Sequence, residues 1–122
     1  MNVETGTMCW FDFATKDQTK AMTFFKTVFG WQYEAMGKEY WMIKVGADTI
    51  GGLRLETKTE FKAAQGFSPY FAVPSIKEAK GLVTKAGGKL VGETETIEGE
   101  HGFYQYFSDL DGNVLSLWSK KP

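Results

Sequence analysis

The chain has 122 residues and a formal net charge of -1, with charges of both signs interspersed, which gives no indication of nucleic-acid binding. Aromatic residues make up 16% of the sequence, and a chain of this length can bury a substantial core as one domain. The single cysteine excludes an intrachain disulfide, and neither a leader peptide nor an apolar run of about 18 residues is visible. We therefore expect a soluble, cytoplasmic protein with no membrane partner.

The first half of the chain predicts one strand, then a helix, then three more strands. The four strands are expected over residues 7–14, 31–35, 40–45 and 49–55. Asp17 is a suitable N-cap, apolar residues recur with helical spacing over 19–29, and Gly30 ends the helix. The polar stretch 56–68 is interpreted as a connector to the second half.

The second half repeats this order. Its strands are expected over residues 70–73, 89–93 and the two arms of a hairpin within 103–118. Ser75 and Glu78 form a capping box at the start of a helix that ends at Gly87 and Gly88. The hairpin turn over 109–113 contains Asp, Gly and Asn, the residues that such turns favour.

The repeated order predicts an α+β fold built from two βαβββ units. We expect one domain over 1–122, with units at about 5–57 and 68–120. Side-chain identity between the halves is low, so the evidence is the shared pattern of strands, helix and terminal glycine. Because one such unit covers only one face of its sheet, pairing two units would enclose the other face.

Strand alternation predicts a ligand site on one sheet face. Residues two apart on a strand share a face, and the repeat places Tyr70 where Trp10 lies in the first half. The residues expected to line one concavity are Trp10, Asp12, Tyr70, Tyr104, Tyr106, Ser116 and Trp118. These side chains are apolar in bulk but carry hydroxyls, a carboxylate and indole N–H groups, which suits a ligand cavity. A packed core whose tyrosines reach the surface is the alternative.

Three segments resemble the vicinal oxygen chelate superfamily, which includes glyoxalase I, bleomycin-resistance proteins and extradiol dioxygenases. They read FFKTVFGW, AVPSIKEAKGLVTKAGGKLV and FSDLDGNVLSLW, and their order and spacing span nearly the whole chain. The resemblance implies a cavity inside a curved mixed sheet. It also implies a homodimer, because related short chains commonly dimerise. It says little about the reaction, since this scaffold hosts several chemistries.

The resemblance also implies where metal ligands would lie, and this sequence departs from the pattern there. Three of the family's His, Gln or Glu positions fall at Trp10, Tyr70 and Ser116, and the fourth falls near Gly51 or Gly52. Indole, neutral phenol and serine hydroxyl groups are poor ligands for divalent metals. We therefore expect neither a metal nor another cofactor.

Four other features each have two interpretations. His101, the only histidine, is either a general acid or base near a cavity mouth or a solvated loop residue. Asp12 is either a general base with a raised pKa or a carboxylate that pairs with a nearby lysine or caps a turn. Cys9 has no activating neighbour in the sequence and is interpreted as a small buried thiol. The turn 109–113 lacks the later ligands of a calcium loop, which favours a simple hairpin.

The leading functional hypothesis is a metal-independent small-molecule-binding protein whose concave cavity takes an apolar or aromatic ligand. The alternative is a glyoxalase-like lyase or isomerase, or a related metal-dependent enzyme. A third hypothesis is an interaction module whose cavity is filled by its own side chains. No catalytic residue and no particular ligand can be assigned from the sequence.

Overall fold

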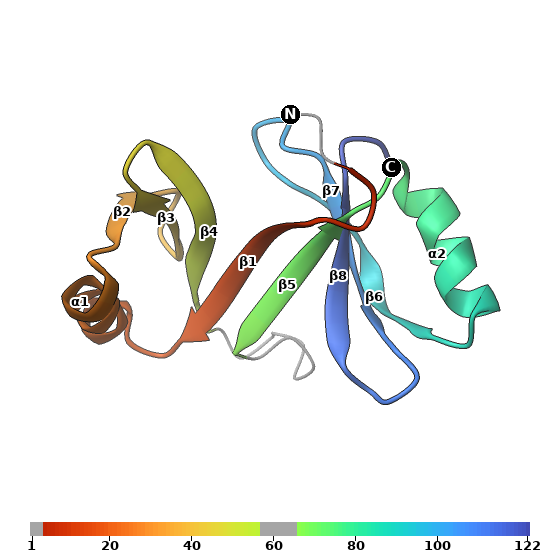
Figure 1. Ribbon diagram of the computed structural model, residues 1–122, viewed down its shortest axis with the longest axis horizontal. Helices are drawn as coiled ribbons and strands as arrows, with labels where there is room; N and C mark the ends of the chain where they lie inside the picture. Colours follow the sequence, from red (N-terminus) through yellow and green to blue (C-terminus); the bar gives the residue numbers. More distant parts are fainter. Residues whose placement is uncertain (1–3, 57–65) are drawn as a thin grey trace. The chain divides into compact units, whose positions relative to one another are not determined.

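A computed structural model describes residues 4–56 and 66–122, and within them the order strand, helix, three strands occurs twice (Figure 1). The elements are β1 (Met8–Thr15), α1 (Gln18–Phe29), β2 (Gln32–Ala35), β3 (Tyr40–Val45), β4 (Asp48–Leu55), β5 (Phe67–Ala72), α2 (Ile76–Lys85), β6 (Lys89–Thr96), β7 (Phe103–Ser108) and β8 (Val114–Ser119). The predicted α+β class with tandem βαβββ units is confirmed. Most of the predicted connector 56–68 lies outside the described residues.

Contacts divide the chain into two compact units. The first unit is Trp10–Phe67, and the second is Ser68–Pro122 together with Met1–Cys9. The segment before β1 belongs to the second unit because it forms backbone hydrogen bonds with the end of β5. The N–H of Gly6 donates to the carbonyl of Ala72 (2.8 Å), and the N–H of Ala72 donates to the carbonyl of Thr7 (2.9 Å). The predicted single domain with units at 5–57 and 68–120 stays a prediction.

The sheet of the first unit has the strand order β2-β3-β4-β1, with β1 parallel to β4 and the other neighbours antiparallel. Helix α1 covers one face of this sheet (Figure 1). Aromatic rings make the contact: Phe13 stacks on Phe25 at 5.4 Å between ring centroids, and the Phe25 ring lies 5.1 Å from that of Trp31. Beneath them Ile43 and Leu53 are fully buried. The opposite face, called the open face below, carries Asp12 and Gly52 at the same level.

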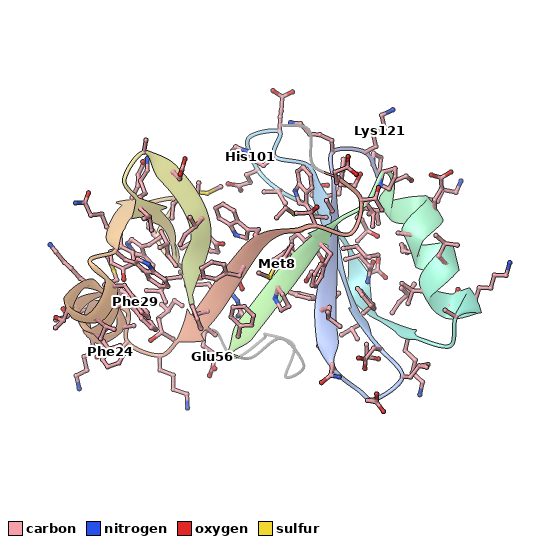
Figure 2. All side chains as sticks on the ribbon, in the orientation of Figure 1. Met8, Phe24, Phe29, Glu56, His101 and Lys121 are labelled. Atoms are coloured by element: carbon pink, nitrogen blue, oxygen red, sulfur yellow. The ribbon has the colours of Figure 1, made fainter. Side chains whose placement is uncertain are left out.

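The ends of α1 form as predicted, but its outer side is less covered than its apolar spacing suggests. The Asp17 carboxylate accepts a hydrogen bond from the N–H of Lys20 (3.1 Å), and Gly30 ends the helix with φ of 74°. No residue of α1 is buried. Phe24 and Phe29 are each 60% exposed (Figure 2). Phe25 therefore anchors the helix, and Phe24 is not a core residue.

The sheet of the second unit has the order β5-β8-β7-β6, with β5 parallel to β8 and the other pairs antiparallel. Helix α2 begins at the predicted cap, where the Ser75 hydroxyl accepts from the N–H of Glu78 (3.3 Å). Its buried residues Ile76 and Ala79 pack with Leu117 of β8 to form the core of this unit. The sheet face away from α2 is the open face of the second unit.

Strand β6 is longer than the short strand predicted over 89–93. It passes through a bulge and pairs with β7 again beyond it. The buried Gln105 amide fills the bulge, donating to the carbonyls of Val91 and Gly92 (both 3.1 Å) and accepting from the Thr94 hydroxyl (2.8 Å). Because the Gln105 side chain bonds to the backbone of the bulge, β6 can continue beyond the interruption in its pairing with β7. The alternation of residues in the sequence is also interrupted there, so the predicted strand ends too early.

The closing hairpin turns at the predicted residues. The Asp109 carboxylate accepts from the N–H groups of Asp111 and Asn113 and from the Asn113 amide, each at 2.9 Å. These bonds, led by the one from the Asn113 side chain, hold the pKa of Asp109 below its ordinary value of 3.8. Within the described residues, α1 has 12 residues and α2 has 10, so neither helix could cross a membrane.

Candidate functional site

The open face of the second unit carries two rows of polar-tipped side chains. Tyr70, Ser116 and Tyr106 lie level on three adjacent strands, because Ser116 of β8 pairs with Tyr70 of β5 on one side and with Tyr106 of β7 on the other. In the next row Trp118 pairs with Tyr104. These registers place all five side chains on one sheet face, as strand alternation predicts.

Tyr70, Tyr104 and Tyr106 form a cluster of mutually inclined rings, which we call the tyrosine cluster. Tyr104 meets Tyr70 and Tyr106 edge to face, at centroid distances of 5.8 and 5.5 Å. Tyr70 and Tyr106 lie 6.4 Å apart, and their hydroxyls are 3.4 Å from each other. Tyr70 and Tyr106 are each 6% exposed, so their rings are largely covered, and the three rings pack on one another with the inclined geometry that aromatic side chains favour.

The hydroxyl of Ser116 is buried and lacks a partner. Ser116 is 0% exposed, and among residues 4–56 and 66–122 its Oγ has no hydrogen-bond partner. A buried hydroxyl without a partner costs about 1–3 kcal/mol relative to one that is satisfied. Native proteins keep few such groups, and those that they keep commonly bind a water or a ligand atom. This hydroxyl lies between the two tyrosines of its row.

The indole N–H of Trp118, which the sequence analysis counts among the polar groups of the site, has a partner in the protein. Its Nε1 donates to the backbone carbonyl of His101 (2.9 Å), which ties the loop before β7 to β8. Gly102 allows this approach with φ of 100°, and a Cβ there would contact the Ser119 carbonyl oxygen at 2.5 Å. The His101 side chain is exposed, which favours the solvated-loop interpretation of the only histidine.

The open face of the first unit holds a buried polar network around Asp12, which is 2% exposed. Arg54 Nε donates to Asp12 Oδ1 (3.1 Å), forming an ion pair. The Tyr40 hydroxyl donates to Asp12 Oδ2 (3.4 Å) and accepts from the indole Nε1 of Trp10 (2.9 Å). Asp12 therefore forms an ion pair, as one interpretation of the sequence held, but its partner is Arg54 and not a lysine.

Gly52 makes this network possible. It lies opposite Asp12 on β4, and a Cβ built on it would overlap the Tyr40 ring. The bare backbone thus allows the phenol to lie over the strand and reach both Trp10 and Asp12. A glycine inside a strand often marks such a close approach.

Tyr40 and Arg54 were not predicted as site residues. Tyr40 begins its strand, where alternation alone gives no reason to select it. Arg54 is an isolated cation between Leu53 and Leu55, and its side chain is only 12% exposed. The sequence held one indication of this site, which is the charged Arg54 in an otherwise apolar strand, two residues after Gly52.

The residues at the family's metal positions do not fit a divalent ion. Three of these positions are Trp10, Tyr70 and Ser116, whose indole, phenol and hydroxyl groups are poor ligands for a divalent metal. That the fourth position falls near Gly51 or Gly52 stays a prediction. Across residues 4–56 and 66–122, no three His, Cys, Asp or Glu side chains group closely enough to hold a metal.

Cys9 is held in a structural role. Its thiol donates to the Tyr70 carbonyl (3.6 Å) behind the tyrosine cluster, and burial raises the pKa of this thiol above its ordinary value of 9.0. A raised pKa keeps the thiol protonated and therefore a poor nucleophile. Cys9 was predicted to be buried, and in the structure it is partly buried.

The seven predicted site residues fall in different units. Trp10 and Asp12 belong to the first unit, while the tyrosine cluster, Ser116 and Trp118 belong to the second. Each group lies on the open face of its own unit. That all seven line one concavity stays a prediction.

Comparison with known proteins supports the resemblance. No family model matches the chain. The curated proteins named "Putative glyoxylase CFP32" in Mycobacterium bovis and Mycobacterium tuberculosis are 26% identical over 122 residues, covering 93% of this chain. Since the match covers 45% of each relative, the chain spans about half the length of these proteins.

Solved structures decide the fold. A glyoxalase/bleomycin resistance protein/dioxygenase superfamily member from Vibrio splendidus matches with a TM-score of 0.63 at 13% identity, over 89% of this chain and 95% of that one. The chain has the vicinal oxygen chelate fold. The Mn(II)-bound glyoxalase of Novosphingobium aromaticivorans also matches, with a TM-score of 0.67 at 19% identity, over 95% of this chain and 39% of that one. At these identities the vicinal oxygen chelate fold is shared, and the chemistry is a separate question.

Proposed function

We propose that the protein is a metal-independent small-molecule-binding protein of the glyoxalase/bleomycin-resistance type, and that its ligand is planar and largely apolar or aromatic. The observation that supports this most is the tyrosine cluster beside the unpartnered Ser116 hydroxyl. Ring faces and edges provide apolar contact area, and a few placed hydroxyls fix orientation, which is the usual composition of ligand sites.

Metal independence is the second part of the proposal. It is supported by the residues at three of the family's ligand positions, which are Trp10, Tyr70 and Ser116. None of these side chains supplies an imidazole or a carboxylate. The nearest buried carboxylate, Asp12, already pairs with Arg54. Elemental analysis after dialysis should therefore find no stoichiometric zinc, nickel, iron or manganese, and about one such ion per chain would overturn this part.

A glyoxalase-like lyase or isomerase is the second candidate. The names of the mycobacterial relatives and of the manganese-bound glyoxalase favour it. Turnover and ligand binding, each measured with metal-loaded and with metal-free protein, distinguish the two candidate functions. The enzyme candidate requires turnover that depends on added metal, whereas the binding candidate requires ligand binding that metal removal leaves unchanged.

A thermal-shift screen tests the proposed function directly. The protein is first treated with a chelator, then scanned against planar aromatic compounds and size-matched aliphatic ones. A ligand that binds only the folded state raises the melting temperature, by an amount that grows with concentration above the Kd. We expect aromatic compounds to raise it in metal-free protein. Shifts that appear only when a divalent metal is restored would refute the proposal.

We further propose that the protein is a cytoplasmic homodimer. The dimer follows from the resemblance, and Phe24, Val28 and Phe29 of α1, each more than half exposed, are an apolar surface of the kind that protein interfaces use. The cytoplasmic location rests on the single cysteine.

A further inference from the structure

The bulge in β6 lies opposite Gln105, between two rings of the tyrosine cluster. Tyr104 and Tyr106 are two residues apart on β7, whereas their partners Glu95 and Val91 are four residues apart on β6. Strand β6 therefore carries two extra residues at this point. Bulges bend and twist a strand locally, and they are frequent next to functional sites, where they redirect a side chain.

The Gln105 amide holds this bulge together. Alternation on β7 places Gln105 on the side of the sheet that α2 covers, where it is 0% exposed. Its Nε2 donates to the carbonyls of Val91 and Gly92 in the bulge (both 3.1 Å) and to the carbonyl of Tyr106 (2.9 Å). Its Oε1 accepts from the Thr94 hydroxyl (2.8 Å). Because carbonyls surround one end of the amide and a hydroxyl donates to the other, only one orientation of the amide satisfies all of these groups.

The network continues from the bulge to α2. Lys80 of α2 donates from Nζ to the hydroxyl oxygen of Thr94 (3.1 Å). The Thr94 hydroxyl gives its single hydrogen to Gln105, so its oxygen is left to accept from Lys80. A chain of hydrogen bonds thus joins α2, the bulge and the backbone of Tyr106.

Stability alone gives a weak reason for a buried amide at this position. Gln105 lies between Phe103 and Phe107, which pack against the α2 core, and an apolar side chain facing a regular β6 would be nearly as stable. Fully satisfied polar networks instead specify one geometry of the surrounding backbone. The backbone that this network fixes carries Tyr104 and Tyr106, whose rings are inclined at 74° with centroids 5.5 Å apart.

We propose that Gln105 is a positioning residue of the ligand site. By holding the bulge, it sets the inclination of the Tyr104 and Tyr106 rings, and so the affinity for a planar ligand. This rests on the proposed function and deepens it by naming a residue that acts on the site from the opposite face of the sheet. The Thr94 hydroxyl fixes the amide of Gln105, and Lys80 ties the network to α2.

The neutral fluorescent probe N-phenyl-1-naphthylamine tests this in chelator-treated protein. Tyr106→Ala first establishes that the probe binds at the tyrosine cluster. Gln105→Met replaces the amide by an apolar chain of similar size, and we expect it to weaken probe binding about fivefold, the effect of misplacing one contact of hydrogen-bond strength. It should also shift the ring resonances of Tyr104 and Tyr106 in NMR spectra, which a uniform loss of stability would not do.

Thr94→Val and Thr94→Ser are a matched pair that tests the same network with smaller changes. Only the second keeps the hydroxyl that fixes the amide. Thr94→Val should weaken probe binding and shift the same tyrosine resonances, whereas Thr94→Ser should leave both as in wild-type protein. Val83→Ala is the control for stability, because it removes packing from the α2 core without touching the bulge. It should lower the free energy of unfolding and leave the probe affinity unchanged.

The outcomes distinguish the two proposals. Weaker probe binding with shifted tyrosine resonances in Gln105→Met or Thr94→Val, but not in Thr94→Ser or Val83→Ala, supports the positioning role. Wild-type affinity in the folded variants of Gln105 and Thr94, or an equal loss of affinity in Val83→Ala, overturns that role and leaves the proposed function standing. Failure of wild-type protein to bind the probe, or wild-type affinity in Tyr106→Ala, overturns both.

Discussion

Replacing Gly52 by alanine should break the Asp12 network without removing any of its polar groups. The added methyl group would overlap the Tyr40 ring, so the phenol must leave its place over β4. Its hydrogen bonds with Trp10 and Asp12 are then lost. These are worth about 1 kcal/mol for the indole bond and about 1.5 kcal/mol for the bond to the charged carboxylate. Alanine also lowers the conformational entropy of the unfolded chain relative to glycine, and this offsets about 0.5 kcal/mol of the loss. We therefore expect Gly52→Ala to lower the free energy of unfolding by about 2 kcal/mol.

A double-mutant cycle with Tyr40→Ala attributes this loss to its cause. In the Tyr40→Ala background no ring opposes the methyl group, so Gly52→Ala should be neutral or stabilise by about 0.5 kcal/mol. Urea denaturation of the four proteins gives the free energies. Gly81→Ala in α2 is the control, because a Cβ there meets nothing within 4 Å, and it should stabilise by about 0.5–1 kcal/mol. An equal loss from Gly52→Ala in both backgrounds would refute the reasoning.

Three further predictions concern other parts of the molecule. The Tyr33 hydroxyl is buried without a partner in the described part of the chain, and burial raises the pKa of Tyr33. Tyr33→Phe should therefore be neutral or stabilise the protein by up to about 1 kcal/mol in urea titrations, and a loss above about 1 kcal/mol would contradict this. The folded pKa of Asp109 lies below its ordinary value, so its carboxylate stabilises the hairpin fully above pH 3.8 and loses this effect as the pH falls through the lowered pKa. Asp109→Ala should therefore lower the melting temperature at pH 7 but not at pH 2, and an equal difference at both pH values would count against it. Light scattering at micromolar concentration should give the mass of a dimer, and a strictly monomeric mass would end that proposal.

Local signals in the sequence predicted the elements well. The caps at Asp17 and Ser75, the stop at Gly30 and the turn at Asp109 each act through hydrogen bonds or backbone angles of a few adjacent residues, so they can be read without knowing the fold. Strand alternation predicted which residues of the closing hairpin share a face, because a period of two does not depend on the partner strand.

Properties that depend on tertiary packing could not be read in the same way. The spacing of α1 predicts an apolar face, but which apolar residues are covered depends on ring positions in other elements, and Phe24 remains exposed. The indole N–H of Trp118 was expected to face a ligand, yet it donates a hydrogen bond to the carbonyl of His101. The loop that carries His101 lies beside Trp118 only in the folded chain. Tyr40 and Arg54 meet Asp12 from 28 and 42 residues away, a separation at which single-sequence patterns carry no pairing information.

The central claim is that the metal-free protein binds a planar aromatic ligand through the tyrosine cluster. The most direct measurement is calorimetric titration of chelator-treated protein with the best compound from the thermal-shift screen, using wild-type protein, Tyr106→Ala and Phe107→Ala. Phe107 is the matched control, since it follows Tyr106 on β7 but packs on the α2 side. We predict saturable binding to wild-type protein, an affinity at least about tenfold weaker in Tyr106→Ala, and unchanged affinity in folded Phe107→Ala. Wild-type affinity in Tyr106→Ala, or binding that requires added metal, would contradict the claim.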